Sequence, residues 1–149
     1  MREQFNAQLK EAMKAGDKRR VATIRMITAA LKDRDIEARG TGKTVTDDDI
    51  LALLQKMVKS RQESAEIYEK AGRTDLSTQE REEIAIITDY LPKQMGEDDV
   101  KAAIAAAIAE TGAAGMKDMG KVIASLKAKY TGQMDFGKVS AAVKGMLNG

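Results

Sequence analysis

The stretch Thr88-Asp89-Tyr90-Leu91-Pro92-Lys93-Gln94 separates two different compositions and contains the only proline of the 149 residues. Proline lacks the backbone N–H that a helix needs, and it excludes helical geometry for the residue before it. A helix arriving from the N-terminal side is therefore expected to end at about Leu91. Before this point the helical patterns are long and contain arginine, whereas after it they are short and alanine-rich, with lysine as their only basic residue. We interpret the stretch as the joint between an N-terminal domain, residues 1–92, and a C-terminal domain, residues 93–149.

The composition favours helix throughout, because strong helix formers dominate and aromatic residues make up only 3%. We therefore expect an all-α fold. The chain has no cysteine and no histidine, which excludes disulfides, thiolate metal sites, cysteine nucleophiles and a histidine base. The first four residues lack the apolar core of a signal peptide, and the longest apolar run, Ala102–Ala109, is too short to cross a bilayer. These features predict a cytoplasmic protein without a membrane partner.

Apolar residues recur at helical spacing through the N-terminal part, where glycines and capping residues separate the segments. Asp17, Thr46 and Ser77 are expected to begin helices as N-caps, Ser77 with Glu80 as a capping box. The helix from Thr46 to Ala71 is the longest, which predicts a long helical hairpin or bundle. The four inward stripes are Phe5, Leu9, Ala12 and Met13; Val21, Ile24, Ile27, Thr28, Leu31 and Ile36; Ile50, Leu53, Leu54, Met57, Val58, Ala65 and Tyr68; and Ile84, Ile87 and Leu91.

Beyond Pro92 the apolar pattern predicts a small three-helix domain, with helices over 96–111, about 117–130, and from the capping residue Asp135 onward. No internal repeat is evident. The inward-facing residues are expected to be Val100, Ile104 and Ile108 in the first helix, Met119, Val122, Ile123 and Leu126 in the second, and Phe136, Val139, Val143, Met146 and Leu147 in the third.

Patterns that resemble catalytic or metal sites have structural explanations. Gly42-Lys43-Thr44 looks like the end of a phosphate-binding loop, but Glu37 stands where that motif needs glycine, and a helix precedes it where the motif needs a strand. The acidic clusters 47–49 and 97–99 fall at predicted helix starts, where carboxylates complement the helix dipole. No serine has a triad histidine, and no spacing points to a serine–lysine pair. No catalytic residue, metal or cofactor is therefore predicted.

Two local excesses of positive charge stand out from a net charge of only +2. Residues 10–25 carry six basic and two acidic side chains, as do residues 116–149, a balance of +4 in each segment. Such clusters suit contacts with phosphates, although a solvated helix face is the alternative explanation. Because aromatic residues are scarce, we expect backbone- and shape-directed contacts with structured RNA rather than base stacking. Gly120 interrupts a helical pattern, which indicates a later helix start, a close neighbouring helix or a close RNA backbone.

An ordered set of motifs over essentially the whole chain resembles the YqeY family. The motifs are Leu54-x-Lys56, Lys59-x-Arg61-x-x-Ser64, Arg73-x-Asp75-Leu76 with Glu80, Tyr90-Leu91-Pro92, Met119-Gly120-Lys121-Val122, Gly132-Gln133-Met134-Asp135, and Val139 with Val143-Lys144 and Leu147.

The C-terminal module of that family is similar to the tail of the GatB subunit of the tRNA-dependent amidotransferase, which amidates Glu-tRNA(Gln) or Asp-tRNA(Asn). That tail is a small helical domain that contacts tRNA. The resemblance implies a three-helix tail-like domain and contact with tRNA, and Gly120, Lys121, Gly132 and Lys144 fall on the shared motif. The candidate RNA-binding residues are Lys117, Gly120, Lys121, Lys127, Lys129, Gly132, Lys138 and Lys144.

We therefore expect a tRNA-binding accessory protein related to tRNA-dependent amidation, with no DNA partner. One alternative is an adaptor of the translation machinery that docks on an amidotransferase or aminoacyl-tRNA synthetase through residues 47–91. A third hypothesis is a carbon–nitrogen ligase activity with glutamine as amido donor, the activity under which the family is often classified. It has the least support, because neither the amidase half nor the nucleotide-using half of that enzyme is recognisable in this chain.

Overall fold

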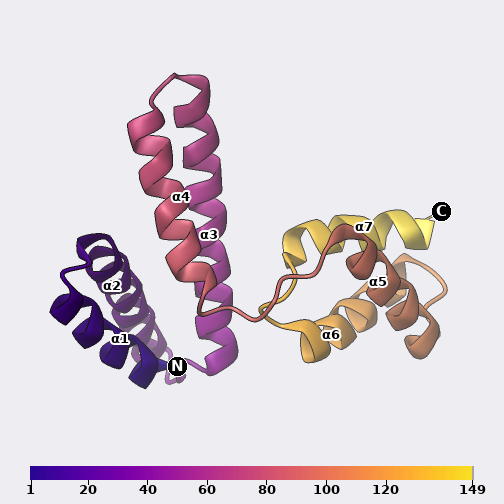
Figure 1. Cartoon of the computed structure of the whole chain (residues 1–149). Coiled ribbons are helices and arrows are strands. Elements are labelled where there is room, and N and C mark those ends of the chain that lie inside the picture. Colours follow the sequence, from indigo (N-terminus) through magenta and orange to yellow (C-terminus); the bar gives the residue numbers. More distant parts are fainter. Residues whose placement is uncertain (149) are drawn as a thin grey trace. The chain divides into compact units, whose positions relative to one another are not determined.

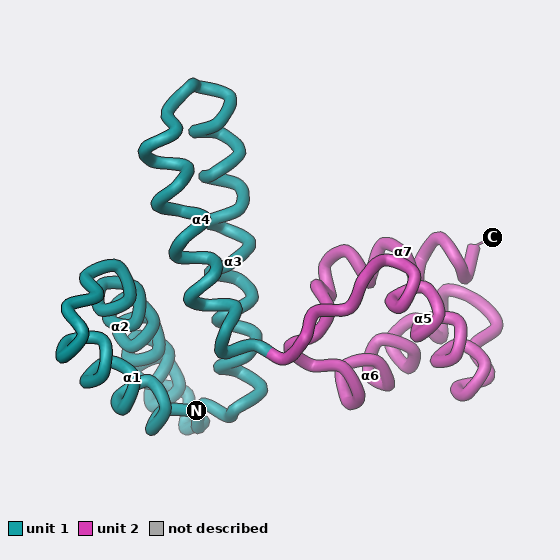
Figure 2. The backbone as a smooth tube through the Cα atoms, in the orientation of Figure 1, with its two compact units in different colours: residues 1–91 teal, residues 92–149 magenta. Residues whose placement is uncertain are grey.

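The computed structural model describes residues 1–148, and they form an all-α fold without a β-strand, as predicted (Figure 1). The chain divides into two compact units, Met1–Leu91 and Pro92–Gly149 (Figure 2). The division falls at Pro92, although independent folding of each unit stays a prediction. The helices are α1 (Arg2–Ala15), α2 (Lys18–Gly40), α3 (Asp47–Lys70), α4 (Thr74–Thr88), α5 (Glu97–Thr111), the short 3-10 helix η1 (Met116–Asp118), α6 (Met119–Tyr130) and α7 (Phe136–Asn148).

Unit 1 consists of two helical hairpins, α1 with α2 and α3 with α4 (Figure 1). Gly16 ends α1 in the left-handed region at a φ of 69°, and the Asp17 carboxylate caps α2 by accepting the N–H of Arg20 at 3.1 Å. Thr46 and Asp49 form a reciprocal capping box at the start of α3. The buried core comprises Phe5, Ile24, Ile27, Leu31, Ile50, Leu53, Leu54 and Ile87.

Tyr90 packs against this core rather than lying open to a ligand. Its ring meets the ring of Phe5 edge to face, with 4.8 Å between centroids, and its hydroxyl donates a hydrogen bond to Gln8. Leu91 also packs on the core. The apolar contacts of unit 1 therefore continue past the end of α4 to the last residue before Pro92.

Three details of the predicted unit 1 helices are wrong. Helix α4 begins at Thr74, so Ser77 lies inside it and its hydroxyl donates to the Thr74 carbonyl at 3.1 Å instead of capping. A serine with a glutamate three residues later fits both an N-cap and a helix interior, so the pattern alone cannot distinguish these two positions. Ile36 is 57% exposed. The first residue of α1, Arg2, pairs with Asp35 of α2, so Ile36 lies beyond the part of α2 that α1 covers. Met13 is 55% exposed and lines a groove described below.

Unit 2 packs α5, α6 and α7 around one apolar core, which includes Ile104, Val122, Leu126, Met134 and Val143. The segment before α5 is held to the α6–α7 turn by two hydrogen bonds: the Met95 N–H donates to the Gln133 carbonyl at 3.0 Å, and the Gln94 side chain donates to the Gly132 carbonyl at 2.6 Å.

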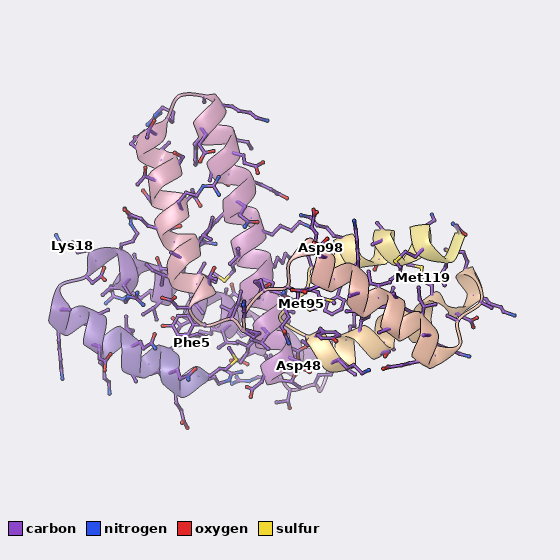
Figure 3. The ribbon with its side chains drawn as sticks, turned by 45° about the vertical axis from the view of Figure 1, so that its right-hand side comes forward. Phe5, Lys18, Asp48, Met95, Asp98 and Met119 are labelled. Carbon is purple, nitrogen blue, oxygen red and sulfur yellow. The ribbon has the colours of Figure 1, made fainter. Side chains whose placement is uncertain are left out.

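The ends of the unit 2 helices follow the sequence closely. Asp135 accepts the N–H of Gly137 at 2.9 Å in the first turn of α7, as an N-cap should. Both acidic clusters occupy first turns as predicted, and Asp48 and Asp98 mark them on α3 and α5 (Figure 3). Met146 was expected inside but is 42% exposed, since it lies at the edge of the inward stripe of α7. Within residues 1–148, no helix combines the length and the apolarity needed to span a membrane.

Candidate nucleic-acid interface

The exposed face of α6 is a ridge of small residues flanked by two lysines. At 3.6 residues per turn, Gly120, Ala124 and Ala128 lie in one line along the helix, and all three are exposed. Lys121 and Lys127 project about 60° to either side of that line. Val122 and Leu126 lie on the opposite face and are fully buried. An approaching molecule therefore meets a smooth backbone surface between two cations.

Helix α7 repeats this arrangement residue for residue. Gly137, Ala141 and Gly145 form its exposed ridge, and Lys138 and Lys144 lie to either side. The segments 120–128 and 137–145 share the pattern Gly-Lys-Val-x-Ala-x-x-Lys-small, and each begins at the second residue of its helix. The expectation that the chain has no internal repeat is therefore wrong. The signal lay in the sequence at a spacing of seventeen residues, but it becomes meaningful only once both segments are known to be helices.

The lysines differ in how strongly they already interact with neighbouring side chains. The Lys129 ammonium lies 2.5 Å from the Glu110 carboxylate of α5, and this hydrogen bond raises the pKa of Lys129. Lys121 lies 3.8 Å from Asp118, and Lys127 lies over the ring of Phe136 with 5.8 Å to the centroid. Lys117, Lys138 and Lys144 are exposed and form no ion pair with any described residue. These three are the lysines most available to an anionic ligand.

The two glycines among the predicted residues have different surroundings. Gly120 lies in the first turn of α6, which starts at Met119, and a Cβ added there meets no atom within 4 Å. A neighbouring helix therefore does not explain it, which leaves the later helix start and the close approach of an RNA backbone. Gly132 is buried and has a φ of 84°, a conformation that favours glycine. Its carbonyl accepts the hydrogen bond from Gln94, so its environment indicates a structural role in the α6–α7 turn.

The predicted residues do not converge on a single point. Helices α6 and α7 pack against one another and both face the core of unit 2, so their outward ridges point away from that core in different directions. Sequence analysis also missed that two of the six basic residues in the N-terminal cluster, Arg19 and Arg20, form ion pairs. Arg19 lies 3.2 Å from Glu82 of α4, and Arg20 lies within 4 Å of Asp17 and Asp89. Two of the six candidate lysines of unit 2, Lys121 and Lys129, are paired as well, so it is the repeated ridge and not a larger number of available cations that distinguishes unit 2.

No alternative catalytic or metal centre emerges from residues 1–148. Within that range no three acidic side chains come together to hold a metal ion. The most buried charged pair is Arg61 of α3 with Glu83 of α4, at 3.0 Å, and sequence reasoning did not find it. No buried side-chain polar atom in the described part of the chain lacks a hydrogen-bond partner. The buried polar groups of the fold are thus satisfied by one another.

Comparison with known proteins identifies relatives over different parts of the chain. A protein named "Altered inheritance of mitochondria protein 41, mitochondrial" from Lachancea thermotolerans is 37% identical over 83 residues, which cover 56% of this chain and 43% of that protein. A protein of the same name from Pyrenophora tritici-repentis is 30% identical over 131 residues, which cover 84% of this chain and 70% of that protein. The chain thus spans less than half of the first relative and more than two thirds of the second.

These names correct the expected cytoplasmic location, because the relatives are named as mitochondrial proteins. The expectation rested on the absence of cysteine, of a signal-peptide core and of a long apolar run. Those features argue against secretion and membrane insertion, but they do not distinguish the remaining compartments.

The family comparison covers nearly the whole chain and agrees with the motifs found in the sequence. The model of a family described as "Yqey-like protein" matches residues 2–147, which include both units and both lysine-flanked ridges. The chain therefore belongs to the YqeY family.

Proposed function

We propose that this protein binds structured RNA, and tRNA in particular, through the lysine pairs of α6 and α7, as an accessory to tRNA-dependent amidation. The observation that carries the proposal is the repeated element, in which two lysines project about 60° to either side of a ridge of glycine and alanine. Small side chains permit close approach of a phosphate backbone, and lysines supply compact positive charges to it. The resemblance of this module to an amidotransferase tail is what selects tRNA among RNAs.

The surroundings of the lysines predict an order of importance. Lys138 and Lys144 form no ion pair among residues 1–148, so a phosphate gains their full attraction. At Lys129 a phosphate has to displace the Glu110 carboxylate, which lowers the net gain. Because aromatic residues are scarce and the ring of Phe136 already contacts Lys127, phosphate contacts rather than base stacking are expected to dominate.

Binding of labelled tRNA, measured by fluorescence anisotropy between 50 and 200 mM salt, tests the proposal. The double variant Lys138→Glu/Lys144→Glu is expected to weaken binding at least tenfold and to reduce the slope of log affinity against log salt by about 2, one per lost contact. The control variant Lys93→Glu/Lys101→Glu has the same charge change at exposed lysines of unit 2 outside the repeat. Equal weakening by both variants, or no tRNA binding at 50 mM salt, contradicts the proposal.

A second pair of variants separates the shape of the ridge from its charge. Ala141→Leu adds bulk to the exposed ridge of α7 without changing charge, whereas Ala105→Leu adds the same bulk to an exposed position of α5. If a phosphate backbone approaches the ridge closely, only Ala141→Leu weakens tRNA binding. If Ala141→Leu leaves tRNA binding unchanged, the proposal is limited to charge attraction, without a defined contact between the ridge and the phosphate backbone.

A protein-interaction adaptor is the second candidate function. The observation that favours it is Ile67 of α3, which is 65% exposed on the α3–α4 hairpin. Affinity capture from RNase-treated lysate with the wild-type chain and with Ile67→Ser tests it. A specific partner that is retained without RNA and lost with Ile67→Ser supports the adaptor, and recovery of RNA-dependent partners alone counts against it.

A further inference from the structure

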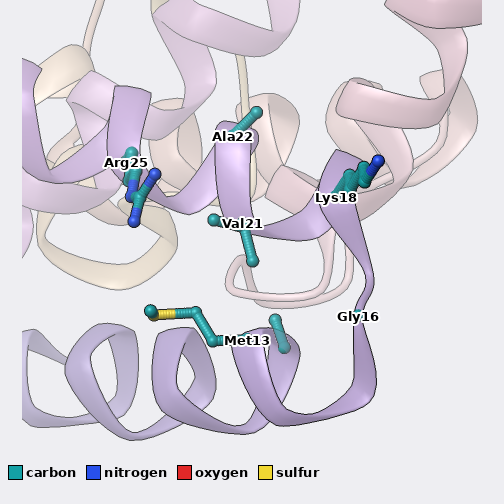
Figure 4. A pocket seen from close by; sticks show the side chains of 7 residues that line it. Met13, Gly16, Lys18, Val21, Ala22 and Arg25 are labelled. Carbon is teal, nitrogen blue, oxygen red and sulfur yellow. The ribbon is translucent and has the colours of Figure 1, made fainter.

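A groove between α1 and α2 has an apolar floor and a cationic side, and the RNA-binding proposal does not use it. It lies beside the turn at Gly16 and encloses about 380 Å³. Its floor includes Ala12 and Met13 of α1 with Val21 and Ala22 of α2, and its lining includes Lys18 and Arg25. In Figure 4, Met13 extends beneath Arg25 and Val21 points toward α1. The residues that line the groove include no carboxylate.

Neither cation of this groove pairs with a carboxylate of the described residues. Seven of the nine arginines of unit 1 form an ion pair with a carboxylate, as Arg2 does with Asp35 and Arg81 with Glu69, and only Arg25 and Arg39 form none with a described residue. The side chains of Arg25 and Lys18 form no ion pair or hydrogen bond with any residue from 1 to 148. Two charges beside an exposed apolar surface remain uncompensated in the free protein.

The apolar floor includes the most exposed methionine of the described residues. Met13 is 55% exposed, although the helical pattern of α1 predicts an inward position. Methionine is flexible and polarisable and is frequent at surfaces that bind helical partners. The exposed Met13 and the half-buried Val21 thus form an apolar surface that a partner can cover at a low cost in free energy.

We propose that this groove binds an amphipathic helix of a partner protein that carries acidic residues beside its apolar face. Lys18 and Arg25 are seven residues apart on α2, so their Cα atoms are separated by about 10 Å along the helix axis. Two carboxylates seven residues apart on a partner helix match that separation, and the side chains between them lie on the apolar floor. Docking of an amphipathic helix in a groove is a common recognition mode. A nucleic acid would satisfy the two cations but leave Met13 uncovered.

The groove has room for a few side chains rather than a whole ligand, since its volume is at the lower end of the range for small-molecule pockets. An apolar side chain that enters it gains contact with Met13, Val21 and Ala12. The acidic residues beside that side chain then lie over Lys18 and Arg25. Charge complementarity therefore determines which amphipathic helices bind.

A displayed library of 16-residue amphipathic helices, with one apolar face fixed and the flanking positions random, tests the proposal on the full-length chain at 150 mM salt. Selection is expected to enrich aspartate and glutamate in pairs seven residues apart. A labelled peptide of the selected consensus is then expected to bind Arg25→Glu at least tenfold more weakly than wild type, and Met13→Ser more weakly too. Replacing its acidic residues by lysine is expected to restore binding to Lys18→Glu/Arg25→Glu.

Lys32→Glu is the matched control, because Lys32 is exposed on the same helix but outside the groove. The three substituted cations are exposed, and a glutamate at position 18 suits the first turn of α2, so folding is expected to be retained. Selection without acidic residues, equal weakening by Lys32→Glu, or unchanged binding to Arg25→Glu overturns the proposal. If Arg25→Glu abolishes tRNA binding and leaves peptide binding intact, the groove is an RNA contact and the proposal is wrong.

Discussion

The α3–α4 hairpin depends on one buried ion pair, and its removal should be far more costly than removal of an exposed pair on the same helices. The Arg61 Nε lies 3.0 Å from the Glu83 Oε2, and the two side chains are 14% and 6% exposed. Arg61 also donates to the Met57 carbonyl at 3.2 Å, and Arg19 of α2 approaches Glu83 at 3.8 Å. Glu83 thus joins three helices of unit 1.

The nearly isosteric variant Glu83→Gln removes the negative charge and leaves the Arg61 charge buried without its counter-ion. Loss of one partner of a buried pair costs about 3–5 kcal/mol. Because Arg61 keeps its Met57 bond and some contact with water, we expect about 3 kcal/mol, the lower end of that range. With an m value of about 1 kcal/mol/M in urea, the unfolding midpoint falls by about 3 M. Replacing both partners, as Arg61→Met/Glu83→Leu, should be close to neutral.

The control is the pair of Arg81 with Glu69, which joins the same two helices at 3.1 Å with both side chains about half exposed. Glu69→Gln should cost no more than about 1 kcal/mol. Urea unfolding followed by circular dichroism measures the free energies, and amide hydrogen exchange in α4 assigns the change to unit 1. If Glu83→Gln costs no more than Glu69→Gln, or if the double variant is as unstable as the single ones, the assignment of stability to the buried pair is wrong.

Two further predictions concern a carboxylate and a pair of glycines. Burial, followed by the neighbouring Glu83, raises the pKa of Glu80 above its ordinary 4.5, so its ionised form is disfavoured in the folded state at neutral pH. Glu80→Gln should therefore raise the urea midpoint at pH 7, and the difference should shrink as pH falls through the raised pKa toward 4.5; a difference that grows on acidification contradicts this. Gly132→Ala should lower the unfolding free energy of unit 2 by about 1–2 kcal/mol because of its φ of 84°, whereas Gly145→Ala, in open space on α7, should raise it by up to about 1 kcal/mol. A stabilising effect of Gly132→Ala or a destabilising effect of Gly145→Ala in thermal unfolding would refute the conformational argument.

The features that sequence analysis predicted well act over a few residues. Asp17, Thr46 and Asp135 cap their helices as expected, because a cap joins a side chain to an N–H two or three residues away. Gly16 and Gly112 end helices for a similarly local reason, the left-handed conformation that glycine adopts without strain. The prediction for Ser77 was wrong, since its local pattern fits both an N-cap and a helix interior. Helix α4 begins at Thr74, which places Ser77 in the interior.

The candidate RNA interface was predictable in composition but not in organisation. All eight predicted residues lie in or next to η1, α6 and α7. The repeat of Gly-Lys-Val-x-Ala-x-x-Lys-small was present in the sequence, yet its meaning required the knowledge that both copies form helices with their valines inward. The identification of Lys117, Lys138 and Lys144 as the unpaired cations came from the structure alone.

The sequence by itself determined the all-α class and most of the helix ends, because capping and left-handed glycines are properties of short segments. Only the tertiary structure decided which charges are available. Lys129 meets Glu110 nineteen residues away, and Arg19 meets Glu82 sixty-three residues away. The same holds for Met13, which has the spacing of a core residue but lines an open groove. Charge pairing and burial depend on which helices pack together, and that is not a property of any one segment.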